Sequence, residues 1–179
     1  MAATAGGSGA TRRDFLYLGT AAVGAAGGVM AAVPFVKQMW PDASILAASS
    51  TEVDLKPIAE GQAVTVKWRG KPVFIRHRTA KEIEEAKATK LADLKDPSPD
   101  TQRVRSFDKK PQEQWIIVLG VCTHLGCVPI KNSGDFLGWY CPCHGSHYDN
   151  AGRIRKGPAP SNLPLPPFEF LSADKIKIG

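Results

Sequence analysis

Two short clusters in the second half of the chain hold the side chains best suited to chemistry. Residues 122–127 read CTHLGC and residues 141–148 read CPCHGSHY, and together they contain all four cysteines. Thiolates and imidazoles bind zinc and iron-sulfur clusters, and thiols also pair as disulfides. The clusters therefore indicate a metal centre or a crosslinked pair of loops.

Three assignments are physically reasonable for these side chains. A structural zinc ion would take four of them in a tetrahedron. Two disulfides would use every cysteine and no histidine in an exported protein. A mixed site would take one sulfur and one nitrogen from each loop, and the C-x-H and C-x-x-H spacings favour it.

Composition limits what surrounds the clusters. With 43% hydrophobic and 22% charged residues in 179, the chain fits one compact domain plus an appendage, and it is neither disordered nor a multi-span membrane protein. The net charge of +6 is mild, and the basic residues are scattered among acidic ones. No concentrated basic face is predicted, so nucleic acid is not an expected partner.

The N-terminal region predicts an export signal and a membrane anchor. Residues 1–10 are small and polar and predict a disordered tail. Arg12 and Arg13 then precede an apolar run, as in twin-arginine signals. Residues 15–36 carry no charge and as a helix would be about 33 Å long, enough to cross a hydrocarbon core of about 30 Å.

The apolar run has three possible interpretations. A retained anchor would leave Arg12 and Arg13 on the cytoplasmic side and export the rest of the chain. A cleaved signal peptide is disfavoured because the run exceeds the usual h-region of roughly 7–15 residues and no clean A-x-A site follows. A buried helix of a soluble core fits the flanking residues poorly. The retained anchor is the preferred interpretation.

The segment after the anchor is expected to be a tether. Residues 38–50 are rich in small residues and lack strand periodicity. Fully extended, residues 41–50 reach at most roughly 30–35 Å. A swinging head and a fixed connector both fit this segment.

Beyond residue 50 the pattern is mostly β. Alternating residues predict a hairpin over 64–68 and 73–76, and residues 168–171 and 175–178 predict a second strand pair. Apolar runs lead directly into each cysteine cluster, from residues 115–121 and from 136–140. One helix is expected over residues 80–95, where apolar positions recur at helical spacing before Asp96-Pro97-Ser98-Pro99.

The motifs resemble those of a known family. The two clusters, together with residues 11–16, 70–78 and 157–160, are similar to the Rieske iron-sulfur subunits of ubiquinol:cytochrome c oxidoreductases, the cytochrome bc complexes, and the similarity covers nearly the whole chain. It implies a mainly β fold with a single N-terminal transmembrane helix, a flexible tether and a Rieske-type antiparallel β-sandwich head. The expected domains are residues 1–14 (tail and signal), 15–37 (anchor), 38–50 (tether) and 51–179 (head), with a cluster-binding subdomain at about 121–160.

The resemblance also implies one [2Fe-2S] cluster and a role for each site residue. Cys122 and Cys141 would bind one iron, and His124 and His144 the other. Cys127 and Cys143 would form a disulfide between the loops. Hydroxyl hydrogen bonds from Ser146 and Tyr148 would tune the cluster, Leu125 and Gly126 would form the quinol-docking tip, and Pro158 would lie in a loop shielding the cluster. His147 is expected to be exposed.

Imidazole ligands would raise the reduction potential. Two neutral imidazoles in place of two thiolates leave the cluster less negative, and a less negative site accepts an electron more readily. This agrees with Rieske potentials of roughly −150 to +300 mV, compared with about −400 mV for plant-type ferredoxins. Hydroxyl donors to the sulfur atoms change the potential in the same direction.

The family's mechanism implies a redox subunit of a translocating enzyme. His144 would accept a proton as an electron passes from ubiquinol to the cluster, and the electron would continue to a c-type cytochrome subunit. The implied partners are cytochrome b and c-type cytochrome subunits in a dimeric complex. The implied location is the bacterial inner membrane, with a single pass, a cytoplasmic N-terminus and a periplasmic head. The alternatives are the Rieske subunit of another exported oxidoreductase, such as an arsenite oxidase, and that of a cytochrome bf complex.

Overall fold

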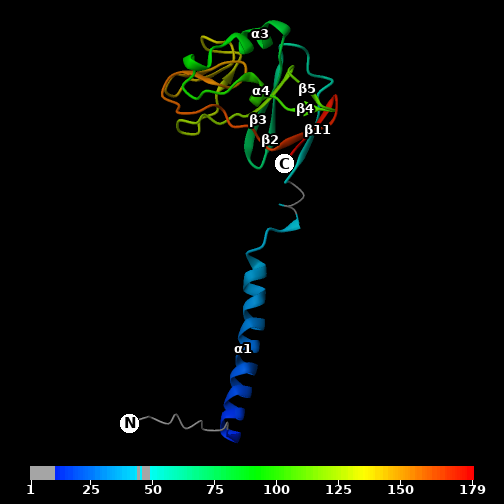
Figure 1. The fold of residues 1–179 in the computed structure, drawn as a ribbon, viewed down its shortest axis with the longest axis vertical. Coiled ribbons are helices and arrows are strands. Elements are labelled where there is room, and N and C mark those ends of the chain that lie inside the picture. Colours follow the sequence, from blue (N-terminus) through cyan, green and yellow to red (C-terminus); the bar gives the residue numbers. More distant parts are fainter. Residues whose placement is uncertain (1–10, 44, 46–48) are drawn as a thin grey trace, which may run out of the picture. The chain divides into compact units, whose positions relative to one another are not determined.

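The computed structural model describes residues 11–43, 45 and 49–179. The chain separates into two compact units, residues 1–46 and 47–179. The first contains a long helix, and the second is a head built mostly of strands (Figure 1). The predicted tail, residues 1–10, and part of the predicted tether, residues 44 and 46–48, lie outside the described residues.

Helix α1 (Arg12–Gln38) contains the whole predicted anchor. It begins with a capping box, in which the Asp14 amide donates to the Thr11 hydroxyl at 3.2 Å and the Thr11 amide donates to the Asp14 carboxylate at 2.9 Å. None of its residues is buried. Among the described residues it is the one helix long and apolar enough to cross a membrane, a test that an N-terminal signal sequence also passes.

The head combines short helical elements with several small antiparallel sheets. Its helical elements are α3 (Ala80–Ala88), the 3₁₀ turn η1 (Leu91–Asp93) and α4 (Asp100–Arg103). Its strands are β1 (Thr51–Asp54), β2 (Ala63–Trp68), β3 (Lys71–His77), β4 (Ser106–Phe107), β5 (Lys110–Pro111), β6 (Trp115–Leu119), β7 (Ile130–Lys131), β8 (Trp139–Cys141), β9 (Ser146–Tyr148), β10 (Ile154–Lys156), β11 (Phe168–Ser172) and β12 (Lys175–Ile178).

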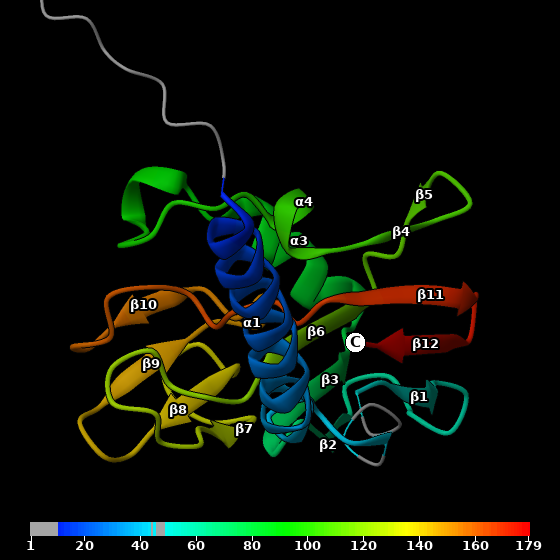
Figure 2. The same ribbon diagram turned by 90° about the horizontal axis from the view of Figure 1, so that it is seen from below.

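Two three-stranded sheets, β1-β12-β11 and β2-β3-β6, contribute side chains to a common apolar core. Both sheets are antiparallel, and they are visible in Figure 2. Alternate residues of β3 and β6 point into this core because side chains alternate between the two faces of a strand. The buried residues of this core are Leu55, Ile58, Trp68, Val73, Ile75, Trp115, Ile117, Ile176 and Ile178.

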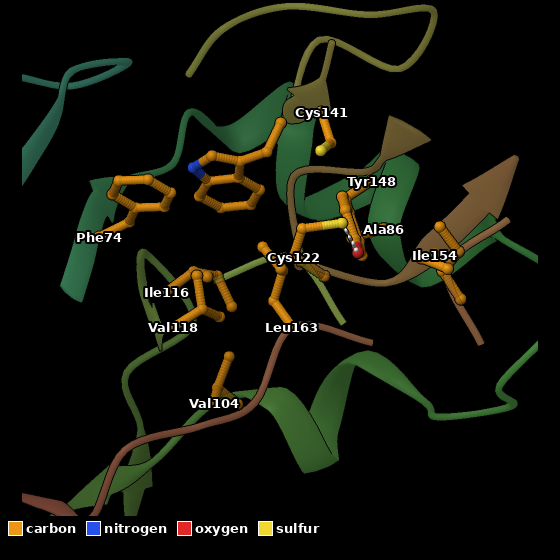
Figure 3. Close-up of a cluster of buried hydrophobic side chains, with 13 residues drawn as sticks. Phe74, Ala86, Val104, Ile116, Val118, Cys122, Cys141, Tyr148, Ile154 and Leu163 are labelled. Atoms are coloured by element: carbon orange, nitrogen blue, oxygen red, sulfur yellow. Dashed lines mark hydrogen bonds between the residues drawn. The ribbon is translucent and has the colours of Figure 1, made fainter. Parts of the chain in front are cut away.

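The opposite face of the β2-β3-β6 sheet is also buried. Phe74, Ile116 and Val118 point away from the first core and pack with residues of the four-stranded sheet β10-β9-β8-β7 (Figure 3). Burial of both faces explains why β6 reads Trp-Ile-Ile-Val-Leu, a continuous apolar run without polar alternation. The sheet that carries the cysteine clusters therefore shares its core with β3 and β6.

The predicted strands largely agree with these elements. The hairpin predicted over residues 64–68 and 73–76 is β2 and β3, and the C-terminal pair is β11 and β12. The predicted mainly β head with one long N-terminal apolar helix is confirmed for the described residues.

The helix predicted over residues 80–95 is correct for its first half and wrong for its second. Helix α3 ends at Ala88, and Thr89 adopts an extended backbone. The Thr89 hydroxyl donates to the Glu85 carbonyl oxygen at 2.9 Å, a local side-chain bond of the kind that competes with helix propagation. Leu94, which would have continued the apolar stripe, is buried outside any helix.

Candidate metal centre

The first cysteine loop follows β6 almost directly. Gly120 lies under the Phe74 ring, where a Cβ atom would come within 2.5–2.8 Å of three ring carbons, so a side chain cannot be accommodated there. The loop then closes on itself: the Cys122 amide donates to the Cys127 carbonyl oxygen at 2.8 Å, and the Gly126 amide donates to the Cys122 carbonyl oxygen at 2.9 Å. Gly126 has a φ of +82°, a value that favours glycine.

The second cysteine loop connects β8 to β9. Cys141 and Ser146 are paired across the two strands, and the Gly145 amide donates to the Cys141 carbonyl oxygen at 3.0 Å. Gly145 has a φ of +72°, which permits the tight turn. The turn buries Cys141 and leaves Cys143 and His144 exposed.

The two loops bring their metal-binding side chains together. The His124 and His144 rings meet edge to face, with centroids 4.6 Å apart. Cys122 and Cys141 are both 2% exposed, and their side chains interact with each other. Each loop thus places one thiol in the core and one imidazole nearer the surface, in agreement with one sulfur and one nitrogen from each loop.

The other two cysteines lie at the same site. The sulfur atoms of Cys127, Cys141 and Cys143 are all within 4.8 Å of one another, so the tightest group of three candidate ligand atoms mixes one predicted ligand with both predicted disulfide partners. The sulfur atoms of Cys127 and Cys143 are thus close to each other. The Cys127–Cys143 disulfide stays a prediction that their proximity supports.

Hydroxyl groups surround the Cys122 sulfur. The Tyr148 hydroxyl lies 3.3 Å from it (Figure 3), as expected. The Thr123 amide donates to the same hydroxyl at 3.3 Å, and the Thr123 hydroxyl lies 3.2 Å from it. Thr123 in turn donates to the Ser161 carbonyl oxygen at 2.6 Å. The sequence prediction missed Thr123, although its place between two predicted ligands was a usable signal.

The two buried thiols have different acidities. Burial raises the pKa of Cys141 to about 12. Burial acts in the same direction on Cys122, but hydrogen bonds from Tyr148, the His124 backbone, Cys141 and Ser146 together outweigh it and lower the pKa of Cys122. A negative charge is therefore favoured at the Cys122 sulfur, where the hydroxyl donors lie. Burial and the bond to Cys122 raise the pKa of Tyr148, which keeps its hydroxyl protonated.

A loop covers the second cysteine loop from one side. A Cβ atom at Gly157 would clash with the Gly145 carbonyl oxygen, which shows how closely the two backbones approach. The Ala159 amide donates to the Ser146 hydroxyl at 3.2 Å. Pro158, between these residues, is exposed. The loop that contains Pro158 therefore lies against Ser146, and its role in shielding the cluster stays a prediction.

His147 was predicted to be exposed, and this is wrong. Its side chain is only 12% exposed. Its Nδ1 accepts a hydrogen bond from the Asp135 amide at 3.0 Å, and its ring packs against Tyr140 and Phe136. Residues of β9 alternate between the two faces of the sheet, so His147 points away from the cluster side, where its neighbours Ser146 and Tyr148 are fully buried.

The donor set fits a [2Fe-2S] cluster. Two buried thiols and two adjacent imidazoles give the mixed sulfur and nitrogen ligands of a Rieske centre. The hydroxyl of Tyr148 is directed at a predicted sulfur ligand, as expected for groups that tune a redox metal.

Comparisons with known proteins agree with this site. The Rieske [2Fe-2S] domain model matches residues 47–168, and the model of the ubiquitinol-cytochrome C reductase Fe-S subunit TAT signal matches residues 2–42. The ubiquinol-cytochrome c reductase iron-sulfur subunit of Bradyrhizobium diazoefficiens is 57% identical over 170 residues, which cover 94% of each chain. This chain belongs to the Rieske iron-sulfur subunit family. The Rhodospirillum rubrum subunit is also 57% identical, over 99% of this chain and 96% of that protein.

A solved structure supports the same family. A chain of a hyperthermophilic respiratory Complex III is 28% identical, with a TM-score of 0.51, and the match covers 89% of this chain and 98% of that one. Membership of the Rieske family confirms the predicted cofactor, a [2Fe-2S] cluster. The match to the TAT signal model confirms the predicted twin-arginine signal.

Proposed function

We propose that this chain is the iron-sulfur subunit of a membrane ubiquinol:cytochrome c oxidoreductase, and that its exposed tip removes an electron and a proton from ubiquinol. The observation that carries the proposal is the contact of the His124 and His144 rings beside two buried thiols. The names of relatives that match nearly the whole chain support a quinol-oxidising complex over an arsenite-oxidase-like or cytochrome bf subunit.

The ligand assignment is part of this proposal. Cys122 and Cys141 would bind one iron, and His124 and His144 the other. When bound, the cluster supplies a one-electron acceptor of raised potential. The hydrogen bonds of Tyr148 and Ser146 would stabilise negative charge on the Cys122 sulfur.

His144 is the residue best placed to take the proton. Its side chain is exposed, and it lies at the end of a turn held by Gly145. One ring nitrogen would bind iron, and the other, in the form that has lost its proton, could accept a hydrogen bond from the hydroxyl of the quinol and take its proton.

The apolar part of the tip would contact the hydrophobic quinol pocket of a partner subunit. Leu125 is 70% exposed and follows His124 directly. Gly126 gives the loop its tight turn, so that Leu125 projects from its end. An exposed leucine near the exposed His144 suits a surface that docks.

The remaining assignments complete the assembly. The domain boundaries predicted above, residues 1–14, 15–37, 38–50 and 51–179 with a subdomain at about 121–160, are proposed for the mature subunit. The anchor would cross the bacterial inner membrane once, with Arg12 and Arg13 in the cytoplasm and the head in the periplasm. Cytochrome b and a c-type cytochrome are the proposed partners, in a dimeric complex, and the c-type cytochrome would receive the electron.

An inhibitor of the quinol site tests the proposal. In membranes containing the complex, such an inhibitor is expected to change the electron paramagnetic resonance spectrum of the reduced cluster, because the tip would contact the occupied pocket. A Leu125→Ala variant should weaken this response, whereas Leu171→Ala, at an exposed position on β11, should retain it. A spectrum that does not respond in the unmodified protein would rule out quinol contact at this tip.

A further inference from the structure

One buried arginine outside the predicted site contacts the backbone of a loop that reaches the metal centre. Arg103, the last residue of α4, is only 7% exposed. Its Nε donates to the Ala151 carbonyl oxygen at 3.0 Å, and its Nη2 donates to the Leu163 carbonyl oxygen at 2.6 Å and approaches that of Gly152 at 3.5 Å. Every acceptor is a backbone carbonyl, and no ion pair of the described residues includes Arg103.

These acceptors lie at the two ends of one loop. Residues 153–162, called here the covering loop, begin after Gly152, include strand β10, which pairs with β9, and end before Leu163. The Leu163 amide donates to the Gly152 carbonyl oxygen at 2.8 Å, so the ends also bond to each other. Gly152 has a φ of +73°, and a Cβ atom there would lie 3.0 Å from the Arg103 guanidinium. A glycine at this position lets the guanidinium approach.

The covering loop bears directly on the candidate metal centre. Its Ala159 amide donates to the Ser146 hydroxyl, and its Ser161 carbonyl oxygen accepts from the Thr123 hydroxyl. Both hydroxyls belong to the network around the Cys122 sulfur. A shift of the loop would therefore move the partners of Ser146 and Thr123 together.

The other end of α4 is fixed to the β-sandwich. Asp100 accepts two hydrogen bonds from Arg78, at 2.7 and 3.0 Å, and both side chains are buried. Arg78 follows β3 and also donates to the Glu113 carbonyl oxygen at 2.9 Å. The short helix α4 thus connects the sandwich, through Asp100, with the covering loop, through Arg103.

We propose that Arg103 is a positioning residue of the metal centre: its guanidinium fork holds both ends of the covering loop on α4 and so keeps Ser146 and Thr123 in place around Cys122. The planar fork is the essential feature, because it reaches carbonyls on both ends of the loop at once, whereas a lysine ammonium is a compact point charge. Burial lowers the pKa of Arg103 to about 10, so the group remains charged at neutral pH. The consequence for the cluster rests on the function proposed above.

The test compares the full chain with Arg103→Met, Arg103→Lys and the control Arg105→Met. Arg105 is an exposed neighbour whose guanidinium lies over the Phe168 ring. Amide hydrogen exchange over residues 153–162 is expected to accelerate at least about tenfold in Arg103→Met, a factor equal to about 1.4 kcal/mol. Exchange in β2 and β3 should not change, and the cluster's reduction potential should fall. Arg103→Lys, which keeps the charge and loses the fork, should behave like Arg103→Met.

Two results would overturn the proposal. Unchanged exchange of the covering loop in Arg103→Met would show that the loop does not depend on this residue. Wild-type exchange and potential in Arg103→Lys would show that charge suffices and the fork does not matter. If Arg103→Met fails to fold, Arg103→Lys decides alone. Hydrogen exchange can be measured without the cluster, whereas absence of a Rieske spectrum in the unmodified protein would count against the proposed function only.

Discussion

Removing the Tyr148 hydroxyl is expected to lower the reduction potential of the cluster. The hydroxyl lies 3.3 Å from the Cys122 sulfur and is held in the core by a fully buried ring. Tyr148→Phe keeps the ring and its packing and deletes the hydrogen bond. Because an added electron makes the cysteine sulfur more negative, the bond should strengthen on reduction, and its loss should destabilise the reduced form.

The size of this shift in potential depends on how the Tyr148 hydroxyl divides its hydrogen bonds between two partners. Hydrogen bonds to charged groups contribute about 1.5–3 kcal/mol, and the Tyr148 hydroxyl divides its contacts between Cys122 and Thr123. We therefore expect the hydrogen bond to stabilise the reduced form, relative to the oxidised form, by at most about 1.5 kcal/mol. This difference corresponds to roughly a tenfold change in the one-electron equilibrium, or about 59 mV.

A redox titration of the purified full chain, followed by circular dichroism or electron paramagnetic resonance, measures this shift. Tyr140→Phe is the matched control, because Tyr140 is on the adjacent strand and its ring packs against His147, away from Cys122. A potential in Tyr148→Phe equal to that of Tyr140→Phe would refute the argument that this hydroxyl acts on the Cys122 sulfur. A rise in potential would refute the assumed sign.

Two further predictions concern metal uptake and the support of the site. Burial raises the pKa of Cys141 from 9.0 to about 12, so this thiol is protonated at neutral pH and must release its proton to bind a metal. The affinity of the cluster-free chain for cobalt(II), measured by the thiolate absorption band, should therefore increase as the pH rises towards 9. The expected increase is about tenfold per pH unit for each thiol proton released. Affinity independent of pH would contradict this, and Cys141→Ser should weaken the band because one of the two proposed thiolate ligands is lost. Arg78→Met should destabilise the head by about 3–5 kcal/mol because it leaves Asp100 buried without its partner. Denaturant unfolding measures this change, and Lys81→Met, at an exposed position, is the control. Equal stabilities of the two variants would show that the Arg78–Asp100 pair contributes nothing.

The sequence predicted best those features that depend on local pattern. Alternation located β2 and β3, and the spacing of Cys122, His124, Cys141 and His144 identified residues that the structure brings together. Local pattern could not predict the long-range contacts. The environment of His147 depends on a backbone amide twelve residues away, at Asp135.

Two other features also depend on the tertiary fold. The end of α3 at Ala88 is not marked by glycine or proline, and Thr89, where it stops, is a residue that many helices tolerate. The role of Arg103 depends on carbonyl groups 48 and 60 positions away in the sequence. Neither periodicity nor a short motif records such contacts.

The burial of β6 on both faces affects how the head unfolds on heating. The first cysteine loop begins at Gly120, one residue after β6 ends, and β6 belongs to both hydrophobic cores. We therefore expect the loop to unfold together with β6, so that the ligand geometry is lost in the same cooperative transition that unfolds the head. The colour of the bound cluster would then report the integrity of the entire β-sandwich, including strands that lie far from any iron ligand in the sequence.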